Sequence, residues 1–391
     1  MREGSPAPSV GASNKWSSFV EFMLVGGATF VLLPLGWLLR RFVGLDDAEL
    51  AAGFTTFYAA YVVNDPHFAV TYLLFYRDVR RRAFGSDVPL AQRVRFLVSG
   101  LLVPVALVSW ALWALGHQSA QTLGWMVQLM YLLVGWHYVK QGFGVLTVLC
   151  ARRGIGLTVW ERRASLFHAF AGWAYAWANP SMPAGEFEEK GVVYRQLAHP
   201  RWFELIALGV LGASVVLLAG VLLRGIMTKR RRLPFAPLAG FLVTIWSWTI
   251  YSGADPVFRY LVPALHSVQY FYFVWLMRRN EARAHEGPPT FGRPVAVRLG
   301  TLLLSALGLG FLLFRAVPTF LDDAFVPRAH GRPLHEAMGN TPYFAAFFVI
   351  VNVHHYFMDH VIWRRENADT KYLRDAPATP VVAADAAARA A

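Results

Sequence analysis

The sequence predicts an all-α protein, a polytopic bundle of about ten transmembrane helices with both termini in the cytoplasm. Of its 391 residues, 56% are hydrophobic and 16% are charged, and the mean hydropathy is +0.39. This composition is typical of membrane proteins and not of soluble domains. Ten windows are long and apolar enough to cross a bilayer, and basic residues accumulate after every second window.

The ten windows follow one another without a second domain, so we expect a single transmembrane helical domain over residues 18–365. Their approximate bounds are 18–39, 51–76, 96–116, 122–150, 164–179, 202–223, 235–253, 257–277, 299–317 and 342–363. Residues 1–17 are expected to be a short cytoplasmic segment. The Ala-rich residues 366–391 are expected to be a disordered cytoplasmic tail.

The basic residues set the expected orientation. The segments that follow the even-numbered windows contain 25 lysines and arginines, and the segments after the odd-numbered windows contain far fewer. By the positive-inside rule, the even-numbered windows end in the cytoplasm. We therefore interpret the net charge of +13 as a topology signal and not as a nucleic-acid patch. The chain is expected to be a multi-pass protein of a bacterial inner (plasma) membrane.

Four histidines lie in the middle of four even-numbered windows. His67, His137, His266 and His354 precede the arginine that ends each segment by 10 to 15 residues. At the helical rise this is roughly 15 to 22 Å, near the middle of a bilayer. Polar side chains at that depth are costly and usually mark a function, so the pattern predicts a buried metal site. The single cysteine, Cys150, leaves imidazole and oxygen as the available ligands.

Other polar residues accompany the first two histidines. Asp65 lies on another face of the helix from His67 and is a candidate supporting or proton-handling group. Pro66 is expected to kink this helix, and Asp65 could instead satisfy the backbone opened there. Lys140 and Gln141 follow His137 by three and four residues, on the same helical face. Such a face also suits a polar cavity without metal.

The last two histidine windows are similar. Gln269 and Tyr270 follow His266 by about one turn. In the final window, His354 and His355 point about 100° apart, so one of the two is expected to reach a given metal. Asp359 is four residues after His355 and on the same face.

Several of these motifs resemble the Brp/Blh-type β-carotene 15,15′-dioxygenase family of polytopic membrane proteins. The segment 265–275 (LHSVQYFYFVW) is similar to the family's His-Ser-x-x-His-Phe-x-Phe-Val-Trp pattern, with His266 on the first histidine and Tyr270 in place of the second. His354 followed by Asp359 is similar to the family's His-x4-Asp ending.

The two earlier motifs depart further from the family. Pro66-His67 is similar to its Pro-His-Gly-x-x-x-Asp stretch, but Phe68 and Thr71 replace the glycine and the acid. After His137, Gly142 stands where an aspartate is expected. The resemblance implies an iron site built from several histidines, with O2 as the co-substrate.

These observations together predict a non-haem Fe(II)-dependent oxygenase that takes an apolar substrate, an isoprenoid, carotenoid or lipid chain, from the bilayer. The expected metal ligands are His67, His137, His266 and His354, with His355 as a substitute for His354. Gln141, Gln269 and Asp359 are expected to hold ligand tautomers, and Tyr270 and Asp359 are the candidate catalytic residues.

Other functions use the same residues. The main alternative is a transporter or proton-translocating protein that employs Asp65, Lys140 and Asp359. A di-iron desaturase would need clustered histidine boxes, which this sequence lacks. A bis-histidine haem or quinone protein and a purely structural role are further alternatives.

Overall fold

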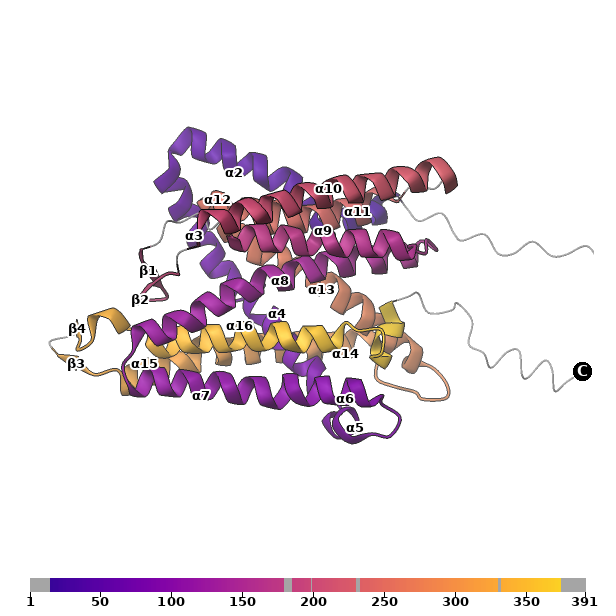
Figure 1. Ribbon diagram of the computed structural model, residues 1–391. Coiled ribbons are helices and arrows are strands. Elements are labelled where there is room, and N and C mark those ends of the chain that lie inside the picture. The colour runs from indigo at the N-terminus through magenta and orange to yellow at the C-terminus, as the bar shows by residue number, and fades with distance from the viewer. Residues whose placement is uncertain (1–14, 179–184, 198, 230–232, 330–331, 374–391) are drawn as a thin grey trace, which may run out of the picture.

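The computed structural model describes residues 15–178, 185–197, 199–229, 233–329 and 332–373, and this part of the chain is nearly all helical (Figure 1). Up to residue 178 the elements are α1 (Lys15–Phe22), η1 (Met23–Gly27), α2 (Thr29–Val43), α3 (Leu45–Ala60), α4 (Asn64–Phe75), α5 (Val79–Phe84), α6 (Leu90–Leu97), η2 (Val98–Leu102), α7 (Val103–Gly116), α8 (Ala120–Arg152) and α9 (Val159–Ala178). After it come β1 (Glu186–Glu189), β2 (Val192–Arg195), α10 (Arg201–Lys229), α11 (Phe235–Val243), η3 (Thr244–Tyr251), α12 (Ser252–Ala254), α13 (Pro256–Glu286), α14 (Val295–Phe311), η4 (Leu312–Ala316), α15 (Val317–Phe325), β3 (Arg328–Ala329), β4 (Arg332–Pro333), η5 (Glu336–Met338), α16 (Pro342–Ile362) and η6 (Ala368–Leu373).

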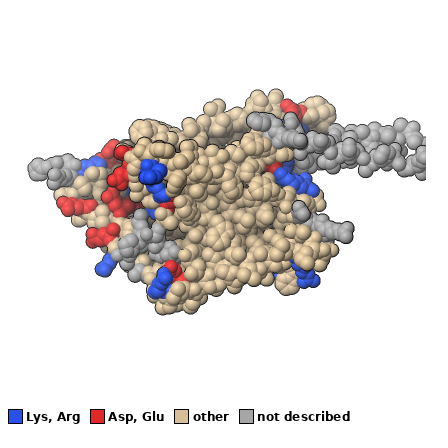
Figure 2. Space-filling model, turned by 90° about the horizontal axis from the view of Figure 1, so that it is seen from above, with Lys and Arg blue, Asp and Glu red and all other residues tan. Residues whose placement is uncertain are grey.

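Several of these helices can cross a membrane. Within the described residues, five helical stretches are long and apolar enough to do so, and a sixth is added if the pair 17–27 and 29–43, bent by 55°, counts as one broken span. Figure 2 shows Lys, Arg, Asp and Glu gathered at the two ends of the molecule, with a broad uncharged surface between them. The protein therefore has the build of an integral membrane protein.

The expected number of ten transmembrane helices stays a prediction. All ten windows lie on mainly helical segments, but not every segment meets the length and hydropathy criteria for a span. α8 and α13 are 33 and 31 residues long, and their mean hydropathy is reduced by the polar side chains of the site described below.

The long helices pack in two groups on either side of α8 (Figure 1). α9, α10 and α11 lie on one side of it, with α10 packed on α9. α16 lies on the other side and contacts α4, α7, α8 and α15. α13 packs against α3, α4 and α14. This arrangement brings the middles of α4, α8, α13 and α16 together in the core.

The second predicted window is broken, which corrects the kink expected at Pro66. A turn at residues 61–63 separates α3 from α4, and Pro66 is the third residue of α4. In the first turn of a helix the missing N–H of proline removes no helical hydrogen bond. The break therefore comes before the proline, and His67 lies in the first turn of a new helix.

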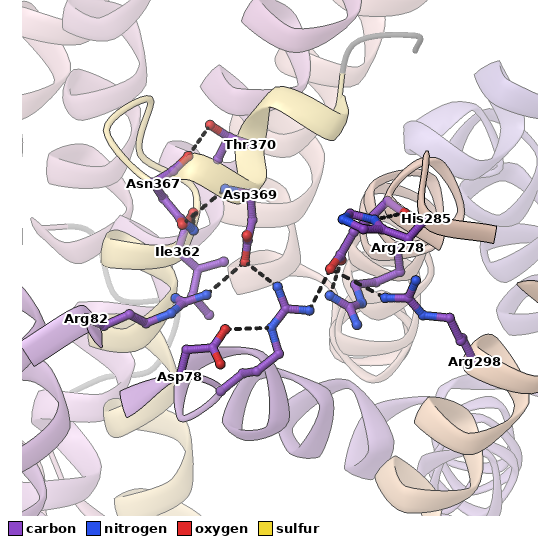
Figure 3. Close-up of polar contacts among 11 residues, drawn as sticks. Asp78, Arg82, Arg278, His285, Arg298, Ile362, Asn367, Asp369 and Thr370 are labelled. Carbon is purple, nitrogen blue, oxygen red and sulfur yellow. Dashed lines mark hydrogen bonds and ion pairs between the residues drawn. The ribbon is translucent and has the colours of Figure 1, made fainter. Parts of the chain in front are cut away.

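The two ends of the molecule differ in structure. At one end, the short antiparallel hairpins β1–β2 and β3–β4 are the strands among the described residues. At the other end, which we call the basic end, α4, α8, α13 and α16 finish close together. Arg77, after α4, pairs with Glu281 of α13 at 2.8 Å and with Asp369 of η6 at 3.2 Å, while Arg82 pairs with Asp369 at 2.8 Å (Figure 3).

The segment expected to be a disordered tail begins with ordered structure. Residues 368–373 form η6, and Leu373 is buried against the core. The backbone oxygen of Leu373 accepts a hydrogen bond from Arg152 at the end of α8. The expectations for residues 1–14 and 374–391 lie outside the described residues.

Candidate metal centre

Four histidines from four helices meet in the core: His67 of α4, His137 of α8, His266 of α13 and His355 of α16. Each offers one ligand nitrogen, and these four nitrogens all lie within 4.8 Å of one another. The four residues are between 0% and 4% exposed. They form a buried group, here called the histidine cluster, that could hold a metal ion.

The four rings form a closed cycle. Their centroids are 4.5 Å apart for His67–His355, 5.0 Å for His67–His266, 4.8 Å for His137–His266 and 4.9 Å for His137–His355, and neighbouring ring planes meet at 69° to 78°. The Nε2 atoms of His137 and His266 are 3.0 Å apart. A hydrogen bond between these two imidazoles would account for that short distance. It would not account for the close approach of the His67 and His355 rings.

Several nitrogens of the histidine cluster have no hydrogen-bond partner in the described structure. They are Nε2 of His67, Nδ1 of His266 and both ring nitrogens of His355. Each buried polar atom left unsatisfied costs about 1–3 kcal/mol. A metal ion removes this cost, because the lone pair of a neutral imidazole is a metal ligand. The donor set therefore fits a bound ion.

Neighbouring helices orient His67. Its Nδ1 lies 3.1 Å from the hydroxyl of Ser267, which follows His266 in α13. The same hydroxyl is within hydrogen-bond distance of Asn64 Oδ1 at 3.1 Å and of the backbone oxygen of Pro263 at 2.8 Å. Hydrogen bonding to one ring nitrogen leaves the other, Nε2, for the cluster.

Asp359 brings a carboxylate to the edge of the histidine cluster. Its Oδ2 lies 3.4 Å from Nε2 of His355 and 3.8 Å from Nε2 of His137, and has no hydrogen-bond partner among the described residues. Its Oδ1 accepts a hydrogen bond of 2.9 Å from the hydroxyl of Tyr270. That hydroxyl is 2.6 Å from the hydroxyl of Thr71. One carboxylate oxygen is thus anchored, and the other faces the imidazoles.

The structure corrects the preference for His354 over His355. The His355 side chain enters the cluster, while His354 points to another part of the core. Nδ1 of His354 is 3.0 Å from the hydroxyl of Tyr72, and its Nε2 is 3.5 Å from that of Tyr76. Successive helical residues diverge by about 100°, so α16 directs one of them to the cluster.

The structure also corrects the role expected for the two glutamines. Gln141 donates to Oε1 of Gln269 at 2.8 Å and to the backbone oxygen of His266 at 3.4 Å. Gln269 donates to the backbone oxygen of Val25 at 2.6 Å, next to Gly26, whose φ of 139° interrupts the first helical stretch. The glutamines therefore join α8 and α13 to η1 and bind no histidine ring.

Two further predicted residues lie outside the cluster. Asp65 forms a buried ion pair of 3.2 Å with Arg315 of η4. The Arg315 guanidinium also lies over the rings of Phe57 and Tyr61, at 4.7 and 4.1 Å from their centroids. Lys140 is half-buried nearer the basic end and makes no ion pair with a described residue. Neither side chain supports a histidine ring directly.

Sequence reasoning missed the supporting hydroxyls of Ser267 and Thr71. Thr71 lies one turn after His67, and this spacing is the signal that could have marked it. Ser267 gave no such signal, because it directly follows His266 and contacts a histidine of another helix.

No family model, no curated protein and no solved structure matches this chain.

Proposed function

We propose that this protein is a membrane-embedded, iron-dependent oxygenase that acts on an apolar chain supplied by the bilayer. The observation that carries the proposal is the histidine cluster of His67, His137, His266 and His355. An all-imidazole donor set without thiolate suits Fe(II), copper or zinc. The motifs around His266 and Asp359, which resemble an iron-dependent dioxygenase family, favour iron.

The protein's own groups provide the surroundings that such chemistry needs. The four histidines would hold Fe(II), and the bound ion would supply the chemistry that activates O2. The cluster is buried, so bulk water is excluded from it. Asp359 and Tyr270 share a hydrogen bond beside the imidazoles and are the groups that hold a proton there. The Tyr270 hydroxyl donates to Asp359, so it can donate to another acceptor in the cluster only if that hydrogen bond breaks.

A transporter uses ionisable groups along one path, and the residues expected for that role belong to separate contacts. Asp65 pairs with Arg315, and Asp359 is bound by Tyr270. Lys140 lies toward the basic end, within the field of Arg364. The described residues therefore favour metal chemistry over transport.

The orientation in the membrane forms part of the proposal. We assign all ten windows as spans, with the basic end and both termini on the cytoplasmic side of a bacterial inner membrane. The basic end carries the arginines that follow α4, α8, α13 and α16, which supports this orientation. The substrate would enter sideways between the helices.

Metal analysis of the full-length protein in detergent tests the central claim. We expect iron at about one ion per chain, lost in His67→Ala and in His266→Ala. His168→Ala is the matched control, because His168 is buried in α9 and contacts Ser214 and Trp246 outside the cluster. Monodisperse wild-type protein that contains no metal, or His67→Ala with full iron content, contradicts the proposal.

Product analysis tests the reaction. Iron-loaded protein is incubated with isotopically labelled O2 in membranes that contain β-carotene and cellular lipids. We expect labelled oxygen in an extracted isoprenoid or lipid, and none with His266→Ala. If no retinal forms, cleavage of β-carotene is not the reaction. If no labelled product of any kind forms, the protein is not an oxygenase.

A further inference from the structure

Two groups of basic residues at the basic end differ in their partners, because acids form ion pairs with the first group. Arg77, Arg82, Arg278 and Arg298 surround the carboxylates of Glu281 and Asp369 (Figure 3). The other group consists of Arg95 of α6, Lys140 of α8 and Arg364, which follows α16, and their charges all act on the ring of His360. We call these four residues the basic cluster.

Contacts between α6 and α16 form one side of the basic cluster. Gln92 donates to the backbone oxygen of Val361 at 3.2 Å, which fixes α6 against the end of α16. α6 and α16 run in opposite directions, so Arg95 lies about one turn from that contact toward the interior, and Arg364 lies about one turn toward the basic end (Figure 1). The charge of Arg95 nevertheless acts on Arg364. Arg364 donates to Nε2 of His360 at 2.7 Å.

α8 forms the other side. Trp136 and His360 have ring centroids 5.4 Å apart, and Lys140 follows Trp136 by one turn. Lys140 and Arg364 are close enough for their charges to act on each other, and the charges of Arg95, Lys140 and Arg364 all act on His360. Three helices thus bring three positive charges to one place.

These charges are not paired with acids. Among the described residues, no ion pair within 4.0 Å joins Arg95, Lys140 or Arg364 to a carboxylate, and Nε of Arg364 is buried without a hydrogen-bond partner. Glu366, an exposed residue, acts on Arg364 from outside. Like charges that are partly removed from water repel one another strongly, so the basic cluster favours an anion from outside the chain.

The basic cluster lies on the same stretch of α8 and α16 as the histidine cluster. α16 packs between α7 and α8 (Figure 1). The half-buried rings of Trp136 and Phe357, 6.4 Å apart, lie next to His137 and near His355. On α16, His360 and Arg364 follow His355 by five and nine residues, which is roughly 7 to 14 Å along the helix.

We propose that the basic cluster binds the anionic headgroup, a carboxylate or a phosphate, of a bilayer amphiphile whose chain extends toward the histidine cluster. The headgroup contacts Lys140, Arg95 and Arg364, and the chain lies along Trp136 and Phe357. Its role as substrate rests on the proposed oxygenase function and narrows the substrate class to anionic lipids. An uncharged hydrocarbon such as β-carotene leaves these cations unpaired.

Binding of defined lipids to full-length protein in an uncharged detergent tests this proposal. Native mass spectrometry with oleate and with lysophosphatidic acid is compared with oleyl alcohol and monooleoylglycerol. We expect saturable binding of the anionic probes, and the tighter of the two identifies carboxylate or phosphate as the headgroup. Removing all three charges in R95Q/K140Q/R364Q lowers this affinity on the order of 100-fold, since each basic residue near a lipid headgroup adds about 1 kcal/mol.

Matched variants keep the test decisive. Arg365→Gln removes an exposed neighbouring charge and is expected to leave the lipid affinity unchanged. If the triple variant misfolds, Lys140→Gln is the milder variant. Lys140→Arg keeps the charge and is expected to bind the anionic probes as the wild type does. Equal affinity for charged and uncharged probes, or unchanged affinity in the folded triple variant, overturns the proposal. Iron is measured in the same samples: a wild type that binds anionic lipid without iron contradicts the oxygenase and leaves the headgroup site standing.

Discussion

At the residue scale, the histidine cluster depends on which of two adjacent side chains α16 turns inward. His355 is fully buried beside Asp359, and His354 contacts Tyr72 of α4 and Tyr76, which follows that helix. Their chemistry is identical, so only position distinguishes them. A polar residue at this depth marks a possible site, but its direction decides whether it is a ligand.

Reciprocal alanine variants test this distinction. His355→Ala is expected to lower metal affinity by more than the roughly 10- to 100-fold typical of losing a group that only supports a ligand. His354→Ala is expected to retain iron, because its ring contacts Tyr72 and Tyr76 outside the cluster. Metal content after dialysis against a graded chelator measures both. Equal losses in the two variants would contradict the assignment.

At the element scale, contacts to η4 and α14 hold the first turn of α4, which contains His67, at the histidine cluster. The ion pair of Asp65 with Arg315 fixes the first turn of α4 to η4. α14 approaches the same turn closely at Gly310, where an added Cβ would lie 2.8 Å from the carbonyl carbon of Asp65. This contact between backbones is possible because residue 310 has no side chain.

Two glycines of α14 provide a matched pair of variants. Gly310→Ala is expected to destabilise the protein by about 1–3 kcal/mol, because α4 and α14 must separate to admit the methyl group. Gly308→Ala is expected to change stability by less than about 0.5 kcal/mol, since a Cβ added there would meet no atom within 4 Å. Thermal unfolding in detergent compares them. Unfolding temperatures equal to that of the wild type in both variants would contradict the close contact of α14 with the first turn of α4.

At the scale of the whole molecule, charge separates the two ends. The basic end carries the arginines of both cation groups, and the other end carries the hairpins with exposed acids such as Glu186 and Glu188 (Figure 2). The uncharged surface between them is the face expected to contact lipid acyl chains. This distribution predicts the orientation without reference to the site.

Cysteine labelling tests that orientation. The single cysteine, Cys150, is buried, and Cys150→Ala gives a cysteine-free background. A membrane-impermeant maleimide added to intact cells is expected to label Glu188→Cys, in β1, and to leave Arg365→Cys unlabelled until the membrane is opened. Both positions are exposed, so access differs only by side. Labelling of Arg365→Cys in intact cells would reverse the proposed topology.

The sequence by itself determined the helical class, the apolar segments, the basic end and the depth of the histidines. These features follow from composition, from the length needed to cross a bilayer, and from the cost of polar groups within it. Three of the cluster's four histidines were first choices on that basis, and the fourth, His355, was the alternative. Asp359 was also recognised, and the structure brings it beside the imidazoles.

The tertiary structure alone decided the rotation of each helix and therefore the partners of each polar side chain. It placed His355 in the cluster, gave Ser267 and Thr71 supporting contacts, and directed Gln141 and Gln269 to backbone oxygens. The physical reason is that lipid tails and the protein core are both apolar, so a membrane helix shows little periodic contrast between its two sides. Depth can then be deduced from sequence, whereas direction depends on how neighbouring helices pack.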